Sequence, residues 1–278
     1  MFATDFSACA DNAMQYASRI ARLSEGKITL LNAFEVPVIA PVNVFTTLED
    51  TMHVVRKEMQ TAVERKAGQV AVAIEDLLEE VMIVEDRPVD AIAEKILDKA
   101  PDLLVMGTRG TNANRGLFMG STAAAVIREA TCPVLAVPEE SSFARIRKIA
   151  YATDLKYDES QVIQYLVRFA ALFDAELVIL HVDKNFSDRA WSLDLLQDLR
   201  DKANYDKIFY REIVHEDVFA AINEFVEEYG IDILATTTAN TSLFERLMFK
   251  SMTKELLTNT AIPMMIFNRK KHDTIFLG

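Results

Sequence analysis

Short apolar runs alternate with amphipathic segments along the first half of the chain. Apolar runs without polar alternation, such as "DLLVM" at residues 102–106, predict strands that are covered on both faces. Apolar positions spaced three and four residues apart predict helices between them. We expect strands at 2–4, 27–34, 81–84, 103–106 and 134–137, and helices at 8–23, 48–78, 89–99 and 121–130. This alternation predicts βαβ units, a parallel sheet and the α/β class.

The second half of the chain repeats this order. "FATDFSACADNAMQY" begins at Phe2 and "YATDLKYDESQVIQY" begins at Tyr151. "DLLVMGTRG" begins at Asp102 and "DILATTTAN" begins at Asp232, and this 130-residue offset persists to "PVLAV" and "PMMIF". Two matched pairs in the same order, with more than a hundred residues per copy, predict two tandem domains.

The polar stretch "PEESSFARIRK" separates the two copies. We place one domain at 1–138, a linker at 139–147, a second domain at 148–270 and a tail at 271–278. The second copy is expected to carry a shorter second helix near 188–203. In the second copy, "IRKIAYATD" predicts a first strand of full length. The first copy offers only "MFATD", so we expect its first strand to be short because the start of the chain is truncated or misassigned.

Charge and cysteine usage narrow the classes of protein. The net charge is −12 over 278 residues, with basic residues interspersed among acids, which disfavours nucleic acids and anionic membrane surfaces as partners. No apolar run is long enough for a membrane span and no secretory signal opens the chain. Cys9 and Cys132 lie in no CxxC motif, so we expect buried, unreactive thiols and a cytoplasmic location.

Four of the eight glycines lie in "GTRGTNANRGLFMGST", between an expected strand and an expected helix. Gly107 and Gly110 can adopt positive φ at little cost, and Gly120 lies where the backbone must approach a ligand closely. Ser121 and Thr122 could cap the next helix, whose N-terminus favours an anion. The alternative without a ligand is a glycine-rich loop that only turns the chain. Neither GxxxxGK[ST] nor GxGxxG is present.

The other candidates for chemistry are weaker. The histidines show no metal-ligand spacing, and His181, in "VILHV", is interpreted as structural. The acid-rich segment 75–86 is interpreted as a solvated helix end rather than a cation site. No GxSxG elbow or general base emerges, so we assign no catalytic residue and no metal ligand.

The glycine spacing, G-x2-G-x9-G-S, resembles the ATP-binding signature of the universal stress protein family. "ATDFS" at residues 3–7 is similar to the family's first strand and turn, and "CPVLAVP" from Cys132 is similar to its last strand. The resemblance spans both copies. It implies two tandem Rossmann-like domains, each a five-stranded parallel sheet of order 3-2-1-4-5, and ATP with Mg²⁺ as the ligand.

The resemblance also implies roles for single residues. Asp5, at the end of the Ala3-Thr4-Asp5 segment, would approach the ribose or adenine, and Ala33 would offer backbone atoms to adenine. The remaining residues would line the ribose and hold the phosphates: Met106, Gly107, Arg109, Gly110, Gly120, Ser121 and Thr122. The Arg109 side chain would either pair with phosphate or face water.

The second copy departs from this signature. At the 130-residue offset, Thr237, Asn240, Arg246 and Lys250 replace the four glycines, and only Ser251 remains. We expect Thr237 to resist positive φ and Lys250 to obstruct close approach, so that this copy has lost the nucleotide site. Arg246 and Lys250 would then either bind another anion or form a solvated basic loop.

Three functions follow. The first is a universal stress protein that binds ATP in its N-terminal domain and acts in stress response or signalling. The second is a protein-interaction scaffold that binds no nucleotide, and the third is a slow ATP hydrolase. The apolar runs "PVLAV" and "PMMIF" are expected to pair the two halves as an intramolecular pseudo-dimer, with a homodimer as a further option.

Overall fold

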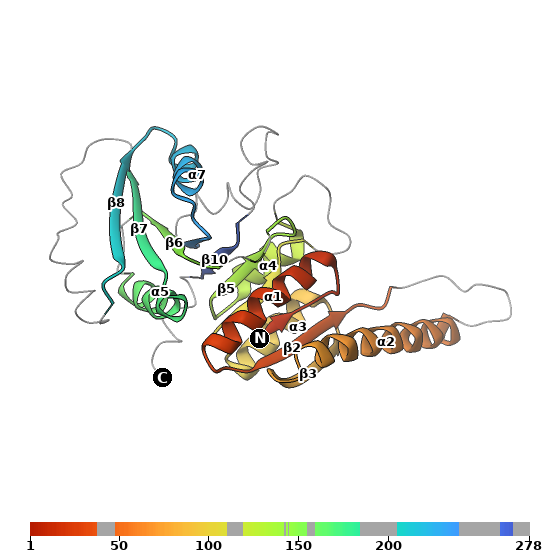
Figure 1. Ribbon diagram of the computed structural model, residues 1–278. Coiled ribbons are helices and arrows are strands. Elements are labelled where there is room, and N and C mark those ends of the chain that lie inside the picture. Colours follow the sequence, from red (N-terminus) through yellow and green to blue (C-terminus); the bar gives the residue numbers. More distant parts are fainter. Residues whose placement is uncertain are drawn as a thin grey trace.

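The computed structural model describes residues 1–37, 48–109, 119–141, 143, 145–154, 159–183, 205–238 and 262–268. These residues form a ten-stranded sheet with helices on both faces (Figure 1). The expectations for the helix near 188–203 and for the tail fall outside this part of the chain. So do those for Gly110, Asn240, Arg246, Lys250 and Ser251.

The first half of the chain forms five parallel strands in the order β3-β2-β1-β4-β5. The strands are β1 (Phe2–Ala3), β2 (Ile28–Phe34), β3 (Leu78–Glu85), β4 (Leu104–Gly107) and β5 (Val134–Val137). The helices are α1 (Ala8–Leu23), α2 (Leu48–Ala73), α3 (Pro88–Lys99) and α4 (Ser121–Glu129). Strand β1 is central but short, and the Met1 α-amino group extends its contacts by donating to the Leu103 carbonyl at 2.9 Å.

The second half forms the same order, β8-β7-β6-β9-β10. Its strands are β6 (Lys148–Thr153), β7 (Glu176–Asp183), β8 (Ile208–Val214), β9 (Ile233–Thr237) and β10 (Met264–Phe267), and its helices are α5 (Ser160–Phe173) and α7 (Val218–Tyr229). Strand β10 lies antiparallel to β5, with Met265 opposite Leu135, which joins the two sheets. The expected fold class, with order 3-2-1-4-5 in each copy, is confirmed.

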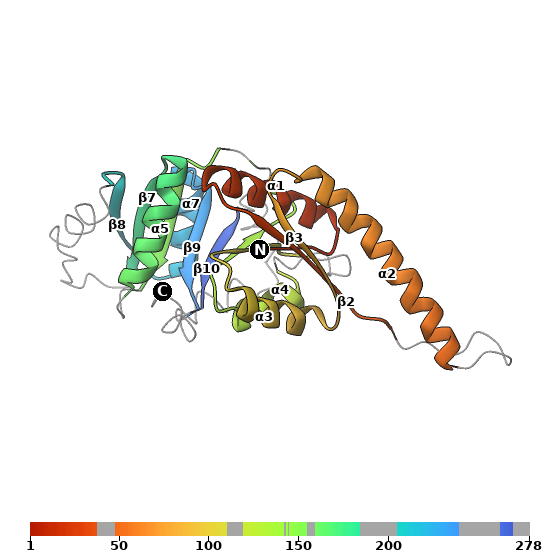
Figure 2. The same ribbon diagram turned by 90° about the horizontal axis from the view of Figure 1, so that it is seen from below.

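Two hydrophobic layers enclose the sheet. One layer contains α1, α5 and the buried Ala67 of α2; the other contains α3, α4 and α7. Figure 2 shows α1 and α2 on one side of the first half and α3 and α4 on the other. Helix α2 continues past the sheet (Figure 2), and of its side chains only Thr51 and Ala67 are buried. None of the helices described here is both long and apolar enough to cross a bilayer.

The segment after α2 differs from the sequence prediction. The helix ends at Ala73 rather than at residue 78, and strand β3 begins at Leu78. Ile74 and Leu77 are buried where the chain turns, which ends the helix against the core. The acid-rich segment 75–86 is therefore mostly strand rather than a helix end. Strand β3 tolerates acidic residues because it lies at the edge of the sheet and exposes Glu79 and Glu80.

Candidate functional site

A cavity of about 610 Å³ lies at the carboxyl ends of β1, β2 and β4, between α2 and the N-terminus of α4. This is the edge where doubly wound sheets bind ligands, and the volume suits a small molecule. Gly110 lies outside the described residues, and the other ten predicted site residues all line the cavity: Ala3, Thr4, Asp5, Ala33, Met106, Gly107, Arg109, Gly120, Ser121 and Thr122.

The turn after β1 is held by side chains that cap their own backbone. The Phe6 amide donates to Thr4 Oγ1 at 3.0 Å, and the Ser7 amide donates to Asp5 Oδ1 at 3.1 Å. Ser7 is the N-cap of α1 and accepts from the Ala10 amide at 3.2 Å. Phe6 has φ 60, a left-handed conformation that costs a bulky residue about 1–3 kcal/mol. This strained turn brings Asp5 and the Phe6 ring to the cavity wall.

The end of β2 contributes a buried asparagine that the sequence analysis did not select. Asn32 Nδ2 donates to the Thr4 carbonyl at 2.7 Å, which ties β2 to the turn after β1. Its Oδ1 is buried and has no hydrogen-bond partner among the described residues. The neighbouring Ala33 also lines the cavity. An asparagine within the apolar run "ITLLNAF" is the signal that could have identified it.

Gly107 is required for packing rather than for a left-handed turn. It is the last residue of β4, and it is absent from the positive-φ residues of the described chain. A Cβ at this position would lie 2.9 Å from Cys9 Sγ, 3.2 Å from the Cys9 carbonyl carbon and 3.3 Å from the Ala10 amide nitrogen. Gly107 therefore does not use the left-handed conformation that the sequence analysis considered for it. The missing Cβ lets the start of α1 lie directly against the end of β4.

The N-terminus of α4 faces the cavity without a side-chain cap. Gly120 is the N-cap, with φ −73 and ψ 160, and it makes no side-chain cap hydrogen bond. Its amide donates to the Thr108 carbonyl at 2.7 Å, which fixes the helix start beside β4. Ser121 and Thr122 are the first helical residues, so the expectation that they cap α4 was wrong. The first-turn amides have no intrahelical acceptor and point where an anion is stabilised.

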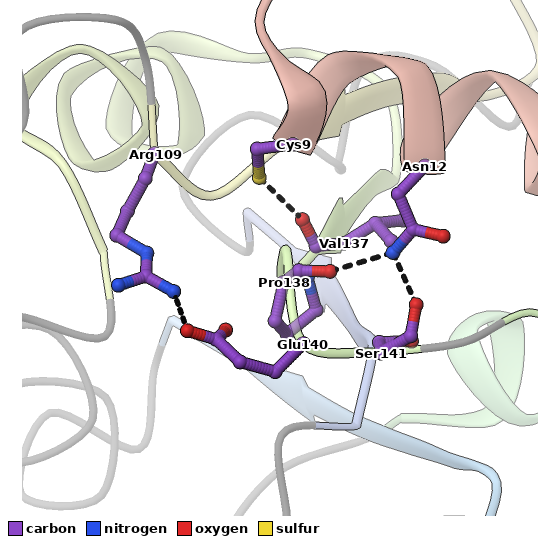
Figure 3. Close-up of polar contacts among 7 residues, drawn as sticks. All are labelled: Cys9, Asn12, Arg109, Val137, Pro138, Glu140 and Ser141. Carbon is purple, nitrogen blue, oxygen red and sulfur yellow. Dashed lines mark hydrogen bonds and ion pairs between the residues drawn. The ribbon is translucent and has the colours of Figure 1, made fainter.

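The Arg109 side chain is mostly buried and is paired with a carboxylate of the protein. Its guanidinium forms an ion pair with Glu140, and only 18% of the Arg109 side chain is exposed (Figure 3). The hydrogen bond to Glu140 raises the pKa of Arg109 further above its ordinary value. The sequence analysis did not anticipate this partner, because Glu140 lies 31 residues away, after β5; a contact of Arg109 with phosphate stays a prediction.

Two cations and two carboxylates line the cavity. Lys66 reaches it from α2 and lies 5.6 Å from the centroid of the Phe6 ring, within range of a cation–π interaction. Arg109 is neutralised by Glu140, while Asp5 and Glu35 supply negative charge. No group of three His, Cys, Asp or Glu side chains suited to a metal occurs in the described residues. Periodicity alone gave no reason to select Lys66.

The second half arranges the corresponding positions differently. Thr237 pairs with Phe267 as Gly107 pairs with Val137, and Thr237 is buried in β9. His181 lies where Asn32 lies in the repeat, and its Nδ1 is 3.0 Å from the Thr153 carbonyl. Glu159 corresponds to the cavity-lining Ala10 in the repeat, but it is the N-cap of α5 rather than a residue inside the helix; it is buried and accepts a hydrogen bond from Thr153 Oγ1.

Both thiols are buried and free, as predicted. Cys9 Sγ lies 3.3 Å from the Val137 carbonyl oxygen beside the cavity (Figure 3). Burial raises the pKa of Cys9, and it raises that of Cys132 to about 11. Thiols held protonated in this way are poor nucleophiles, which argues against a cysteine-based reaction at the cavity.

The universal stress protein family model matches residues 1–138 and 145–268. The chain belongs to the universal stress protein family. A universal stress protein of Thermus aquaticus is 44% identical over 59 residues, which cover 21% of this chain and 43% of that protein. Universal stress protein Slr1230 of Synechocystis is 26% identical over 169 residues, covering 60% of this chain and 58% of Slr1230. The matches thus span less than two-thirds of either relative.

The fold of this universal stress protein has a solved counterpart. The crystal structure of a universal stress protein from Archaeoglobus fulgidus superposes with a TM-score of 0.73, covers 97% of this chain and 98% of that chain, and is 16% identical. At this identity the likeness concerns the fold alone.

Proposed function

We propose that the first domain of this universal stress protein binds ATP in the cavity at the ends of β1, β2 and β4. The observation that carries the proposal is a set of buried polar atoms on the cavity residues that lack a partner in the described part of the chain. They are Asn32 Oδ1, Thr108 Oγ1 and Arg109 Nε. Buried polar groups are normally satisfied, so three together at a cavity point to a polar ligand.

The cavity offers different chemistry at its two ends. The first-turn amides of α4, at Ser121 and Thr122, suit the phosphates. Ala33 at the end of β2 would offer backbone atoms to the adenine, and Asp5 would approach the ribose. Lys66 adds a positive charge to the cavity. Mg²⁺ would arrive with the triphosphate and be held mainly by phosphate oxygens and water.

We expect one nucleotide per chain. In the second domain, the Thr237 side chain occupies the place where Gly107 leaves room. The buried Glu159 would place a carboxylate beside Thr153 at the end of β6, against the charge of a triphosphate. Obstructing the phosphate-binding amides of the first domain should therefore weaken ATP binding by the whole chain.

The wider organisation belongs to the same proposal. The two domains, 1–138 and 148–270, would act as an intramolecular pseudo-dimer; the pairing of β5 with β10 supports this. A linker at 139–147 would join them, and a cytoplasmic location fits the free thiols. The role would be nucleotide-responsive, in stress response or signalling, and no catalytic residue is assigned.

The test is calorimetric titration of nucleotide-free protein with Mg-ATP, on the wild type and two variants. Gly120→Lys should weaken ATP binding at least about tenfold, because a long side chain enters the phosphate end of the cavity. Gly120→Ala should retain most of the affinity, since φ −73 suits any residue. Equal binding by the lysine variant with an intact fold would place the site elsewhere. Absence of binding by the wild type would favour a protein-interaction scaffold.

A further inference from the structure

The Arg109–Glu140 ion pair joins the cavity to the segment that links the two halves. Arg109 lines the cavity, two residues after Gly107. Glu140 is not among the cavity residues and lies in the connector, which we define as residues 139–147. Figure 3 shows the Arg109 side chain reaching across to the Glu140 carboxylate. One edge of the guanidinium is therefore committed to a protein carboxylate.

The connector is held in place next to this ion pair. Asn12 Nδ2 donates to the Pro138 carbonyl at 2.8 Å and also to the Ser141 carbonyl (Figure 3). Tyr16 Oη is 2.7 Å from Ser141 Oγ, and the Tyr16 ring packs edge-on against Phe143 with centroids 4.8 Å apart. These contacts flank Glu140 on both sides in the sequence. Its backbone is therefore fixed, and its carboxylate stays close to Arg109.

The ionisation of the pair agrees with this geometry. Partial burial raises the pKa of Glu140, but the hydrogen bond and positive charge of Arg109 outweigh it, and the net shift of that pKa is downward. Glu140 is therefore fully ionised near neutral pH. The neighbouring Glu139 has no ion pair to Arg109 among those described, although its charge also acts on Arg109.

We infer that Glu140 is an internal competitor for Arg109: a phosphate-bearing ligand in the cavity competes with it for the guanidinium, so that Glu140 lowers the affinity for phosphate. This inference rests on the proposed nucleotide site. A carboxylate and a phosphate oxygen compete for the same N–H donors of a guanidinium. Because Pro138 and Ser141 are held on either side of it, Glu140 competes at high effective concentration. Adenosine, which carries no phosphate, would bind without displacing it.

The competition would change the charge balance of the segment between the two halves. When phosphate takes Arg109, Glu140 loses its partner, while Ser141 stays held by Asn12 and Tyr16. The change in charge therefore occurs in the segment that leads directly into β6 (Lys148–Thr153) of the second half.

The experiment compares ATP and adenosine affinities by calorimetry for the wild type, Glu140→Gln and Glu139→Gln. The two variants remove the same charge from adjacent positions, but only one removes the ion pair. We expect Glu140→Gln to tighten ATP binding by about two- to fivefold, the range of a partly exposed ion pair. Glu139→Gln should change it less than about twofold, and adenosine affinity should be the same in all three proteins. In an Arg109→Gln background, Glu140→Gln should no longer tighten ATP binding.

The outcomes separate this inference from the proposed function. Wild-type ATP binding with no gain in Glu140→Gln would overturn the competition and leave the nucleotide site standing. Weaker binding in Glu140→Gln would also overturn it, because Glu140 would then position Arg109 for the phosphate. Equal gains in ATP affinity in both glutamine variants would mean that the effect comes from the loss of one negative charge near the cavity, and would refute a specific role for Glu140. No ATP binding by any variant would overturn the proposed function and this inference together.

Discussion

The close packing around Gly107 predicts that adding a single methyl group there destabilises the protein. In Gly107→Ala, the new Cβ would lie 2.9 Å from Cys9 Sγ and only 3.2 and 3.3 Å from backbone atoms of Cys9 and Ala10. Cys9 Sγ is buried against the Val137 carbonyl at 3.3 Å and has little freedom to move. The start of α1 must therefore shift away from β4. Overpacking of this kind costs about 1–3 kcal/mol.

Thermal unfolding of variants measures this cost. A loss of about 2 kcal/mol should lower the Tm of the first domain by roughly 4–8 °C. Cys9→Ala combined with Gly107→Ala should recover part of the loss, because the sulfur contact disappears while the two backbone contacts remain. ATP affinity should fall as well, since Ala10 moves with α1 and lines the cavity.

The matched control is Gly68→Ala within α2. A Cβ there meets nothing within 4 Å, and replacing an exposed helical glycine by alanine should stabilise by up to about 1 kcal/mol. The two glycine-to-alanine changes should thus act in opposite directions. A Gly107→Ala protein with a Tm at or above that of the wild type would refute the packing argument.

Three further predictions test the charge, the thiols and the joined sheets. Glu140→Gln should make the free energy of unfolding less dependent on pH in the acid range. Because the pKa of Glu140 is lowered in the folded protein, its contribution, well under ~1 kcal/mol for a partly exposed pair, is present above about pH 5 and is lost as the pH falls through the folded pKa. Acid titration followed by circular dichroism measures this loss. Cys9 and Cys132 should resist a thiol reagent at pH 8 in the native protein and both react in denaturant; rapid native labelling would contradict their burial. Leu135→Ala and Met265→Ala, at facing positions of β5 and β10, should each lower the free energy of unfolding by about 2–5 kcal/mol. The double variant should show a coupling energy of at least about 0.5 kcal/mol in denaturant unfolding. Additive losses would mean that the two halves are not coupled at these positions.

The sequence pattern was sufficient for the fold because the fold depends on features that it carries directly. Apolar runs such as that of β4 and the amphipathic spacing of α1 gave strands and helices close to their observed positions. The repeat gave the second sheet the same strand order as the first. The boundary after α2 failed because Ile74 and Leu77 continue an apolar helical spacing although the chain there already turns into an edge strand.

The candidate site was harder to predict because its details depend on contacts across long sequence separations. The glycine spacing identified the loop, but the reason for Gly107 is the start of α1, about a hundred residues earlier. Arg109 could be assigned only to ligand or water, since its partner Glu140 lies beyond β5. Lys66 reaches the cavity from a helix whose own periodicity gives no sign of a ligand.

The two halves show why the fold can persist while a site is lost. Thr237 occupies the register of Gly107, yet β9 keeps its place between β6 and β10. In the repeat, α5 begins three positions later than α1, at Ser160 rather than at the counterpart of Ala8. A side chain on β9 is thus accommodated where α1 would lie against the strand. Thr237→Gly alone should therefore leave the second domain without ATP affinity, because the helix start and the buried Glu159 also differ; ATP binding near two per chain in that variant would show that the glycine alone decides the site.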